Sequence, residues 1–525
     1  MPITGKNIVG LESLAGGDQT VTAINPSTQK ALSDKFHVAT ASEIEQALAK
    51  SEMAFSSYQQ TNGEERARFL RVIADEIVAL GDELLERASA ESGLPLARFQ
   101  GERGRTVNQL RLFADVLEEG SWVEANLEIG DAQRTPMPKP DIRKMLVALG
   151  PVVVFTASNF PLAFSTAGGD TASALAAGCS VIVKAHESHL GTNELVSMAI
   201  QTAARKTNMP DGVFSSLNGL GYDLGKTLVK DARVKAVTFT GSLKGGMAIH
   251  RLAQEREEPI PVFAEMGSIN PVILLPEAVQ SNHKLPATLV GAITMGVGQF
   301  CTNPGLLIAM KSPALEAFKD ALQMEFSKAG VFTMLNESIY RNFENGKANA
   351  LGQPGVKAEC VVDGRADDWT GRPAIASVSA SDFIANTNLQ NEVFGPFSLV
   401  VECTDISQVT EVIKSLHGQL SGTIFSENNE VANYSSLVSE LVGRVGRVIL
   451  NQVPTGVEVG HAMQHGGPFP ASSDSRFTSV GVDAIKRFVR PVAYQNWPNS
   501  LLPKALQDGN PLTIFRKTNG VFGSL

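Results

Sequence analysis

The residue best suited to chemistry in this sequence is Cys301, which lies in the glycine-rich stretch Gly296–Gly305. Glycines stand on both sides of it and Pro304 follows closely, so the stretch predicts an irregular turn rather than a helix or a strand. A cysteine at such a turn can receive backbone N–H groups, which lower the pKa of the thiol and favour the reactive thiolate. The pattern therefore indicates a nucleophile, although a small apolar residue in a tight loop would have the same pattern.

Two further stretches could bind a nucleotide. Residues 239–246, Phe-Thr-Gly-Ser-Leu-Lys-Gly-Gly, follow a strand pattern and open a helix pattern. Free N–H groups at a helix N-terminus attract phosphate, and glycines let the ligand approach the backbone closely. Lys184 ends another strand pattern and could hydrogen-bond ribose hydroxyls or a phosphate. The alternatives are a plain strand-to-helix turn and a solvated lysine.

The elements that must position these residues alternate between short apolar runs and helical patterns. This alternation runs from residue 145 to about residue 263, and a second series follows as far as residue 451. Strands that alternate with helices predict βαβ units and a parallel sheet, which binds ligands at the carboxyl ends of its strands. We therefore expect two α/β domains with a boundary near Ala264.

The N-terminal third of the chain should be mainly helical. Apolar residues at helical spacing predict helices over 42–58, 62–94 and 102–119, which would cover a sheet. Residues 128–144 contain three prolines and predict an extended arm, either for subunit contact or as a solvated loop. Residues 145–155 form a single apolar run.

Composition and charge narrow the class of protein. The chain of 525 residues is 43% hydrophobic and 19% charged, with a net charge of −9, which argues against nucleic acid or an anionic membrane as its main partner. Its four cysteines are widely spaced and form no disulfide framework, so we expect a reducing compartment. No signal-peptide pattern opens the sequence and no long apolar run suggests a membrane span, so we expect a cytoplasmic protein.

Several separated stretches resemble motifs of the aldehyde dehydrogenase superfamily, in the order usual for that family. They are residues 155–161 (Phe-Thr-Ala-Ser-Asn-Phe-Pro), 239–242 with Gly246, 265–267 (Glu-Met-Gly), 298–301 (Gly-Gln-Phe-Cys) and 391–396 (Asn-Glu-Val-Phe-Gly-Pro). The resemblance spans nearly the whole chain. It implies an α/β fold with two Rossmann-like α/β domains and an oligomerisation ribbon.

The resemblance also implies how the chain is divided and assembled. The expected parts are an NAD(P)-binding domain of residues 1–127 and 145–263, a catalytic domain of 264–450, oligomerisation segments 128–144 and 480–500, and C-terminal loops 451–479 and 501–525. We expect a homodimer or a homotetramer.

Matched position by position, the resemblance assigns three catalytic residues: Cys301 as nucleophile, Glu265 as general base and Asn159 as oxyanion donor. A thiolate that attacks an aldehyde gives a thiohemiacetal, whose oxyanion needs preorganised donors. The thioester left after hydride departure must be hydrolysed, which calls for a base. The implied cofactor-binding residues are Thr156, Lys184, His186, Glu187, Gly241, Ser242, Gly246, Met266, Glu392 and Phe394.

Residues 264–271 and 466–481 depart from the commoner family patterns and look like those of the α-ketoglutaric semialdehyde (2,5-dioxovalerate) dehydrogenases. That resemblance implies oxidation of 2,5-dioxopentanoate to 2-oxoglutarate. A substrate carboxylate calls for a cation in its pocket, for which we expect Arg111. The alternatives are Arg103, Arg105 and Arg476.

The far end of the substrate tunnel and the choice of cofactor stay open. Phe300, beside Cys301, is expected to line the aldehyde tunnel or else to pack in the core. Relatives in this branch often use NADP, whereas a carboxylate such as Glu187 near the ribose favours NAD. Lys184 and His186 could offset that preference, so we expect use of both cofactors, with NADP slightly favoured.

Other functions are compatible with single features. A fatty aldehyde dehydrogenase is the nearest alternative, and a cysteine-dependent acyl transferase or hydrolase is an alternative of another class. A base at Glu265 and the glycine loop argue against the latter. His461 and His465 are four residues apart, as in some zinc sites on helices, but glycines follow and the HExxH glutamate is missing, so we expect no metal.

Overall fold

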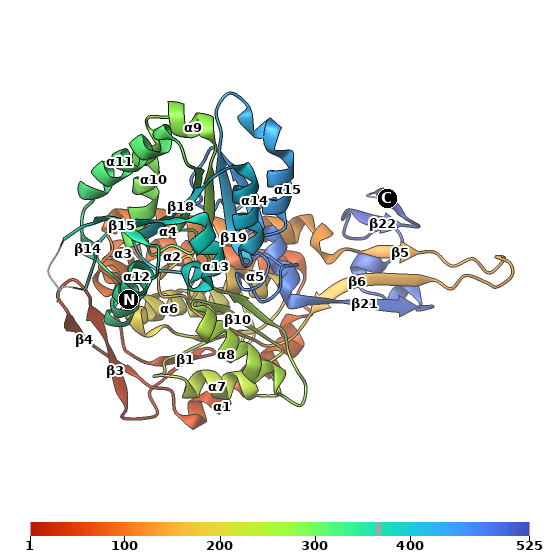
Figure 1. The fold of residues 1–525 in the computed structure, drawn as a ribbon. Helices are drawn as coiled ribbons and strands as arrows, with labels where there is room; N and C mark the ends of the chain where they lie inside the picture. The colour runs from red at the N-terminus through yellow and green to blue at the C-terminus, as the bar shows by residue number, and fades with distance from the viewer. Residues whose placement is uncertain (1, 364–368, 524–525) are drawn as a thin grey trace.

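Two seven-stranded sheets form the body of the protein, and a five-stranded sheet projects from it (Figure 1). The computed structural model describes residues 2–363 and 369–523. Residues 1, 364–368 and 524–525 lie outside the described residues, and so do the parts of the predicted domains that contain them. Within the described ranges, no helix is both long and apolar enough to cross a membrane.

The first sheet carries the parallel order that the sequence predicts. Five strands run parallel, and two N-terminal strands add to one edge in antiparallel fashion. Across the sheet, the strands are β11 (Val262–Glu265), β10 (Ala236–Thr240), β7 (Val152–Phe155), β8 (Val181–Lys184), β9 (Phe214–Leu217), β1 (Asn7–Val9) and β2 (Glu12–Leu14). The separate hairpin of β3 (Thr20–Asn25) and β4 (Lys30–His37) follows β2 in the chain.

Helices cover both faces of this sheet. They are α1 (Ala41–Tyr58), α2 (Gly63–Ala79), α3 (Gly81–Ser92), α4 (Leu96–Glu119), α5 (Gly169–Ala177), α6 (Leu190–Lys206), α7 (Asp223–Lys230) and α8 (Leu243–Gln254). Alternate side chains of a strand point to opposite faces. Accordingly, Val152 and Val154 pack in the core formed with α2–α6, whereas Val153 packs in the core formed with α1, α7 and α8.

Local signals explain where the early helices begin and end. Thr40 with Glu43 and Asn62 with Glu65 form capping boxes at the starts of α1 and α2. The single helix expected over 62–94 is instead two helices, because the chain turns at Gly81, whose φ is 61°. Only glycine adopts that conformation at little cost, so this glycine marks the break that the apolar spacing alone does not show.

The second sheet is built in the same way. Six of its strands run parallel, and β15 joins one edge in antiparallel fashion. Across the sheet, the strands are β15 (Lys357–Val361), β17 (Ala374–Ser379), β18 (Phe397–Cys403), β13 (Leu306–Met310), β12 (Pro271–Leu274), β19 (Gln419–Phe425) and β20 (Val445–Leu450). Its flanking helices are α9 (Pro276–Ser281), α10 (Leu285–Thr294), α11 (Pro313–Ser327), α12 (Glu337–Leu351), α13 (Ala380–Ala385), α14 (Ile406–Ser415) and α15 (Ser435–Val442). The short strands β14 (Phe332–Thr333) and β16 (Thr370–Gly371) pair beside them.

The projecting sheet contains the proline-rich arm. Its strands, in order, are β21 (Val489–Gln495), β6 (Ile142–Ala148), β5 (Asn126–Glu128), β22 (Arg516–Thr518) and β23 (Val521–Gly523). In Figure 1 the β5–β6 hairpin reaches furthest from the body, and the C-terminal end of the chain lies beside it.

This sheet differs from the sequence prediction in two places. The apolar run 145–155 belongs to two sheets, because the chain leaves β6 at Ala148 and turns at Gly150 before β7 begins. Residues 501–525, expected to be loops, contribute β22 and β23, and β22 pairs with β5. The strand Arg516–Thr518 has no apolar alternation, so backbone pairing alone reveals it.

Candidate active site

Cys301 lies in a strained loop that follows α10. Three consecutive residues, Gly296, Val297 and Gly298, adopt left-handed conformations, with φ of 56°, 60° and 65°. For the β-branched Val297 this costs about 1–2 kcal/mol, so the surrounding contacts must hold the loop in place. At Gly298 a Cβ atom would collide with the backbone of Gly395. The loop therefore packs directly on the segment that follows Glu392.

A side-chain amide fixes the other end of this loop. Asn270, just before β12, donates from its Nδ2 to the carbonyl oxygen of Cys301 at 2.8 Å and to that of Asn303 at 3.0 Å. Its Oδ1 accepts hydrogen bonds from the hydroxyls of Ser268 and Ser421. The backbone that carries the thiol is thus held by a buried network that reaches β19 of the second sheet.

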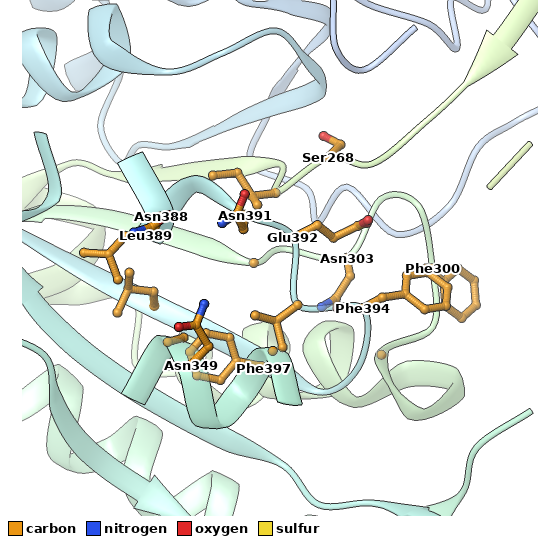
Figure 2. A pocket seen from close by; sticks show the side chains of 17 residues that line it. Ser268, Phe300, Asn303, Asn349, Asn388, Leu389, Asn391, Glu392, Phe394 and Phe397 are labelled. Carbon is orange, nitrogen blue, oxygen red and sulfur yellow. The ribbon is translucent and has the colours of Figure 1, made fainter. Parts of the chain in front are cut away.

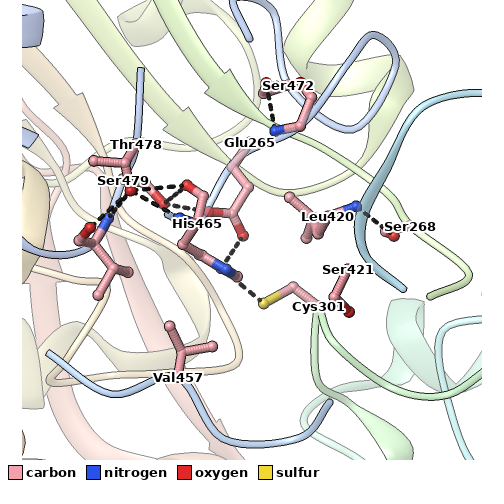
Figure 3. Close-up of polar contacts among 12 residues, drawn as sticks. Glu265, Ser268, Cys301, Leu420, Ser421, Val457, His465, Ser472, Thr478 and Ser479 are labelled. Carbon is pink, nitrogen blue, oxygen red and sulfur yellow. Dashed lines mark hydrogen bonds and ion pairs between the residues drawn. The ribbon is translucent and has the colours of Figure 1, made fainter. Parts of the chain in front are cut away.

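Three reactive side chains meet in one cluster (Figure 3). The Nε2 atom of His465 lies 3.4 Å from the Sγ atom of Cys301 and 2.9 Å from Oε1 of Glu265. The side chains of His465 and Glu265 are only 2% and 5% exposed. Water therefore screens their charges weakly, and a proton can pass between the three groups over hydrogen-bond distances.

The C-terminal segment orients the base side of the cluster. Glu265 ends β11, and its Oε2 accepts a hydrogen bond of 2.5 Å from the Ser479 hydroxyl. The backbone N–H of His465 donates to Thr478 Oγ1 at 2.8 Å, and the N–H of Ser479 donates to the His465 carbonyl at 2.8 Å. Glu265 Oε1 faces His465 Nε2 at 2.9 Å and accepts no other hydrogen bond from the described part of the chain.

The pKa values of Cys301 and Glu265 indicate which of the two carries a proton in the resting cluster. Burial, and then the negative charge of Glu265, raises the pKa of the Cys301 thiol well above its ordinary value. Burial alone would raise the pKa of Glu265 too, but the contact with His465 and the Ser479 hydroxyl bring it below its ordinary value. At neutral pH the resting site is therefore a thiol beside a carboxylate, and the thiol needs a base before it can attack.

The cluster also has the composition of a metal site. The ligand-capable atoms of Glu265, Cys301 and His465 all lie within 4.8 Å of one another. However, the one ring nitrogen that an ion would take, Nε2, already contacts both the thiol and the carboxylate at hydrogen-bond distances. Proton transfer accounts for the same three residue types without an ion.

A pocket of about 330 Å³ opens on the other side of Cys301. It gathers eight of the residues that the sequence predicts for the site: Asn159, Gly241, Ser242, Glu265, Met266, Cys301, Glu392 and Phe394. The amide Nδ2 of Asn159 donates to the carbonyl of Gln299 at 3.0 Å, so the side chain reaches the loop that presents the thiol.

The pocket is shaped for a phosphate-containing ligand such as a dinucleotide. A Cβ atom at Gly241 would lie 2.7 Å from the Phe239 ring, and one at Gly267 would lie 2.6 Å from Glu392 Oε2. Ser242 caps α8, where its hydroxyl accepts from the N–H of Gly245 at 3.2 Å. Backbone N–H groups at this helix start, next to a pocket lined by Gly241, Ser242 and Gly267, fit a pyrophosphate.

Glu392 and Phe394 also line a second cavity (Figure 2), together with the amides of Asn349, Asn388 and Asn391. Burial, with a further contribution from the charge of Glu265, raises the pKa of Glu392 to about 7. The segment that carries Glu392 and Phe394 thus has open space on both sides, which lets it adjust to a ligand.

The remaining predicted cofactor residues lie outside the lining of this pocket, Gly246 in α8 and the other four just at or after the ends of β7 and β8. Thr156 donates from Oγ1 to the carbonyl of Lys184 at 3.3 Å, and Lys184 Nζ lies 3.8 Å from Glu187 Oε1. The same Glu187 oxygen accepts the N–H of Gly221 at 3.1 Å. Burial holds the pKa of His186 well below its ordinary value.

Two of these predicted residues have structural contacts of their own. The His186 ring accepts a hydrogen bond of 3.2 Å from the backbone N–H of Ser188 and stacks on His189. Gly246 lies against Met266, where a Cβ atom would come within 2.6 Å of the sulfur. Both residues therefore shape the backbone near the nucleotide side of the site.

The side chains expected to meet the substrate lie apart from one another. Phe300 packs edge-on against Phe160 at 5.2 Å, and the Arg98 guanidinium lies 5.0 Å from the Phe300 ring. Arg111 is 48% exposed, pairs with Asp75 at 2.9 Å and lines an open outer cavity together with Arg105. The structure brings Phe300 to the thiol loop and leaves Arg111 at the protein surface.

Sequence reasoning overlooked His465. Its spacing from His461 drew attention to a metal, but the structure places no helix there, and His461 is exposed while His465 is buried. The better signal was the segment 466–481, which departs from the common family pattern and includes both Thr478 and Ser479. This segment begins directly after His465, and its residues Thr478 and Ser479 hold the histidine against Glu265.

Comparisons with known proteins show the family of this chain. Residues 14–480 match the model of the family described as "Aldehyde dehydrogenase family". The chain is 48% identical over 522 residues to "Alpha-ketoglutaric semialdehyde dehydrogenase 2" of Azospirillum brasilense, covering 99% of both chains. It is 44% identical over 521 residues to "Alpha-ketoglutaric semialdehyde dehydrogenase" of Acinetobacter baylyi, covering 98% of both.

Solved structures show the same fold at lower identity. The 1-pyrroline-5-carboxylate dehydrogenase from Thermus with bound NAD superposes with a TM-score of 0.79 at 21% identity. The match covers 94% of this chain and 92% of that one. At this identity the likeness concerns the arrangement of sheets and helices.

Proposed function

The chain belongs to the aldehyde dehydrogenase family, and from that premise we propose that it oxidises 2,5-dioxopentanoate to 2-oxoglutarate with NAD(P)+. The proposal for the substrate is supported by the names of two relatives that are 48% and 44% identical over nearly the whole chain. The observation that carries the chemistry is the contact of Cys301 with His465 and Glu265 beside a glycine-lined pocket.

The pocket beside Cys301 would hold the cofactor. Gly241 and Ser242 would hold its phosphates, Lys184 and Glu187 its adenosine ribose, and Glu392 its nicotinamide riboside. Bound there, NAD(P)+ supplies the hydride acceptor. The chain's own residues must hold the aldehyde, generate the nucleophile and release the acid.

The first half of the reaction activates the thiol. As Sγ of Cys301 attacks the aldehyde carbon, the S–H bond breaks and its proton passes to Nε2 of His465. Glu265, ionised in the resting site, stabilises the charged ring that results. The aldehyde oxygen becomes an oxyanion, for which the Asn159 amide is the donor. Loss of hydride from the carbon converts this thiohemiacetal to a thioester.

The second half releases the acid. Oε1 of Glu265 faces only Nε2 of His465 among the described residues, so it takes a proton from water once His465 has given its own proton to solvent. The hydroxide adds to the thioester carbonyl, the C–S bond breaks, and Cys301 leaves as a thiolate that takes up the proton held by Glu265. Ser479, held against Oε2, keeps the carboxylate aimed at the thiol.

We propose that both cofactors are used, with NADP slightly favoured. The carboxylate of Glu187 is held by the Gly221 N–H and lies near Lys184, which offsets its repulsion of a 2′-phosphate. A value of kcat/KM for NAD more than about tenfold above that for NADP, or roughly 1.4 kcal/mol, would contradict this preference.

We further propose a homo-oligomer built on the projecting sheet. Exposed apolar side chains gather on its strands and adjacent turns: Met137, Trp497, Leu501, Phe515, Val521 and Phe522. Large exposed apolar groups of this kind are typical of subunit interfaces. Light scattering distinguishes a dimer or tetramer from a monomer, which would contradict this assembly.

A kinetic panel tests the proposed reaction. It compares 2,5-dioxopentanoate, succinic semialdehyde, glutaraldehyde and octanal with each cofactor, by absorbance at 340 nm. We expect the highest kcat/KM for 2,5-dioxopentanoate. The cluster of contacting rings of Phe160, Phe164 and Phe300 makes a long-chain aldehyde the second candidate, and a preference for octanal would select it instead.

A further inference from the structure

Two guanidinium groups act on the catalytic cluster without a carboxylate partner. Arg105 lies on α4 and Arg447 on β20, and neither comes within 4.0 Å of an acidic group in the described parts of the chain. Burial lowers the pKa of both, and a thiolate at Cys301 would act on each of them in the opposite direction. Both cations are therefore close enough to the thiol to interact with it.

The two side chains hold the same loop. Arg105 donates from Nη2 to the carbonyl of Val457 at 3.3 Å. Arg447 donates from Nη1 to the carbonyl of Gly456 at 3.0 Å and from Nη2 to that of Pro454 at 2.8 Å. The loop 454–457 thus joins the two cations to each other, and Figure 3 labels its residue Val457 in the same view as Cys301 and His465.

Each guanidinium keeps one buried N–H group free. Arg105 Nη1 and Arg447 Nε have no hydrogen-bond partner among the described residues. A buried cation with an unused donor is costly unless an anion meets it. Two such donors on side chains that hold the same loop could together satisfy a carboxylate, which has two acceptor oxygens.

Other arginines near the site are already engaged. Arg98 lies 3.6 Å from Glu102 and donates to the carbonyl of Asn159 at 2.6 Å. Arg476 is 79% exposed and pairs with Asp474, and Arg103 donates to the carbonyl of Gly81 at 2.8 Å. Each of these side chains has a structural partner that uses its charge or its donors.

A path of contacts leads from solvent to the thiol past Arg105. An open cavity lined by Gly101, Gly104, Asn108 and Val457 has Arg105 in its wall. The Arg105 guanidinium lies 4.9 Å from the Phe164 ring, which lies 6.1 Å from the His465 ring.

Three carboxylates also act on Arg105 from a distance. Glu102 accepts the N–H groups of Leu162 and Ala163, Glu265 belongs to the catalytic cluster, and Glu458 lines the outer cavity. None of the three comes within 4.0 Å of the Arg105 guanidinium, which stays available to an entering anion.

Resting on the proposed function, we propose that Arg105 and Arg447 together bind the carboxylate at the far end of the aldehyde. They would make the enzyme selective for short aldehydes that carry a terminal carboxylate. This assignment differs from the sequence prediction of Arg111, which lies at the surface against Asp75.

The test uses Arg105→Met and Arg447→Met in the full-length protein. For each, kcat/KM is measured with succinic semialdehyde and with butanal, which has the same chain length and no charge. We expect the ratio of the two values to fall about 10- to 100-fold, the effect of losing a hydrogen bond to a charged group. Arg71→Met, which removes an exposed charge from α2, is the matched control.

The outcomes separate this inference from the proposed function. A wild-type enzyme that prefers butanal would overturn the proposed function. A wild-type preference for the semialdehyde that survives both substitutions, or that falls only in Arg111→Met, would overturn the assignment to Arg105 and Arg447. Equal losses on both substrates would show a purely structural role and would also overturn it. If Arg447→Met does not fold, Arg447→Lys keeps the charge and should lower the ratio by an intermediate amount.

Discussion

Replacing His465 with glutamine removes the base nearest to the catalytic thiol while keeping a side chain of similar size. The Nε2 atom of His465 lies 3.4 Å from Sγ, and burial with the Glu265 charge raises the pKa of Cys301 well above its ordinary value. An ordinary thiol is only a few per cent ionised at pH 7, and each unit added to its pKa lowers that fraction tenfold. Without His465, only this small fraction should attack.

We therefore expect His465→Gln to slow the first turnover by about 10²–10⁴-fold at pH 7, the range for a general base. The rate should then rise nearly tenfold per pH unit through the neutral range, as the thiol of Cys301 ionises unaided. The wild-type enzyme should show a much weaker rise, because the proton passes to the ring during attack.

Two assays report this directly. Single-turnover formation of reduced cofactor measures attack on the aldehyde, and alkylation by iodoacetamide measures the nucleophilicity of the thiol without substrate. His461→Gln changes an exposed histidine four residues away and serves as the matched control. If His465→Gln and the wild type are alkylated at the same rate across pH 6–9, the ring is not the base and the reasoning is refuted.

Three further substitutions test separate parts of the site. Gly298→Ala places a Cβ against the backbone of Gly395, so we expect loss of turnover with little change in secondary structure by circular dichroism; an active variant would show that the loop is not fixed. Asn159→Ala should lower kcat about 10²–10³-fold with little change in cofactor binding, and an unchanged kcat would remove it from the oxyanion site. The pKa of Glu392 is raised to about 7 in the folded protein, whereas the unfolded chain loses this proton above about pH 4.3. Between these two pH values only the folded state keeps the proton, so the unfolding free energy falls as pH rises to 7. Glu392→Gln should therefore gain up to about 3 kcal/mol in unfolding free energy relative to wild type between pH 4.5 and pH 8, measured in urea, and an equal difference at both pH values would contradict the shift.

Much of the fold follows from local patterns in the sequence. Short apolar strands between amphipathic helices predicted both parallel sheets, because each buried strand of this kind needs helices on its two faces. The sequence prediction was wrong where pairing with a distant strand decides whether a segment forms a strand. Nothing in the run 145–155 shows that Ala148 ends a strand in one sheet and Val152 begins a strand in another. The strand Arg516–Thr518 exists because β5 is there to pair with it.

The site was predictable wherever a motif carries its own chemistry. Cys301, Glu265 and Asn159 were predicted because a nucleophile, a base and an oxyanion donor each need a particular residue type, and the structure brings all three to one pocket. His465 lies 164 residues from Cys301 along the chain, so only the fold shows that the two are in contact. The sequence cannot tell a paired arginine from an available one for the same reason. The ion pair of Arg111 with Asp75 joins two helices and cannot be inferred from one helix alone.

The central claim is that aldehyde carbon becomes covalently bound to Cys301 and is released with the help of Glu265. The most direct measurement uses Glu265→Gln, which leaves the thiol in place and removes the carboxylate that activates water. After one turnover with 2,5-dioxopentanoate and NADP+, the protein is quenched in acid and its peptides are analysed by mass spectrometry. The account predicts one equivalent of reduced cofactor and the acyl group on the peptide that contains Cys301. Full hydride transfer with no acyl group on that peptide, or with the group on Cys179, Cys360 or Cys403, would contradict it.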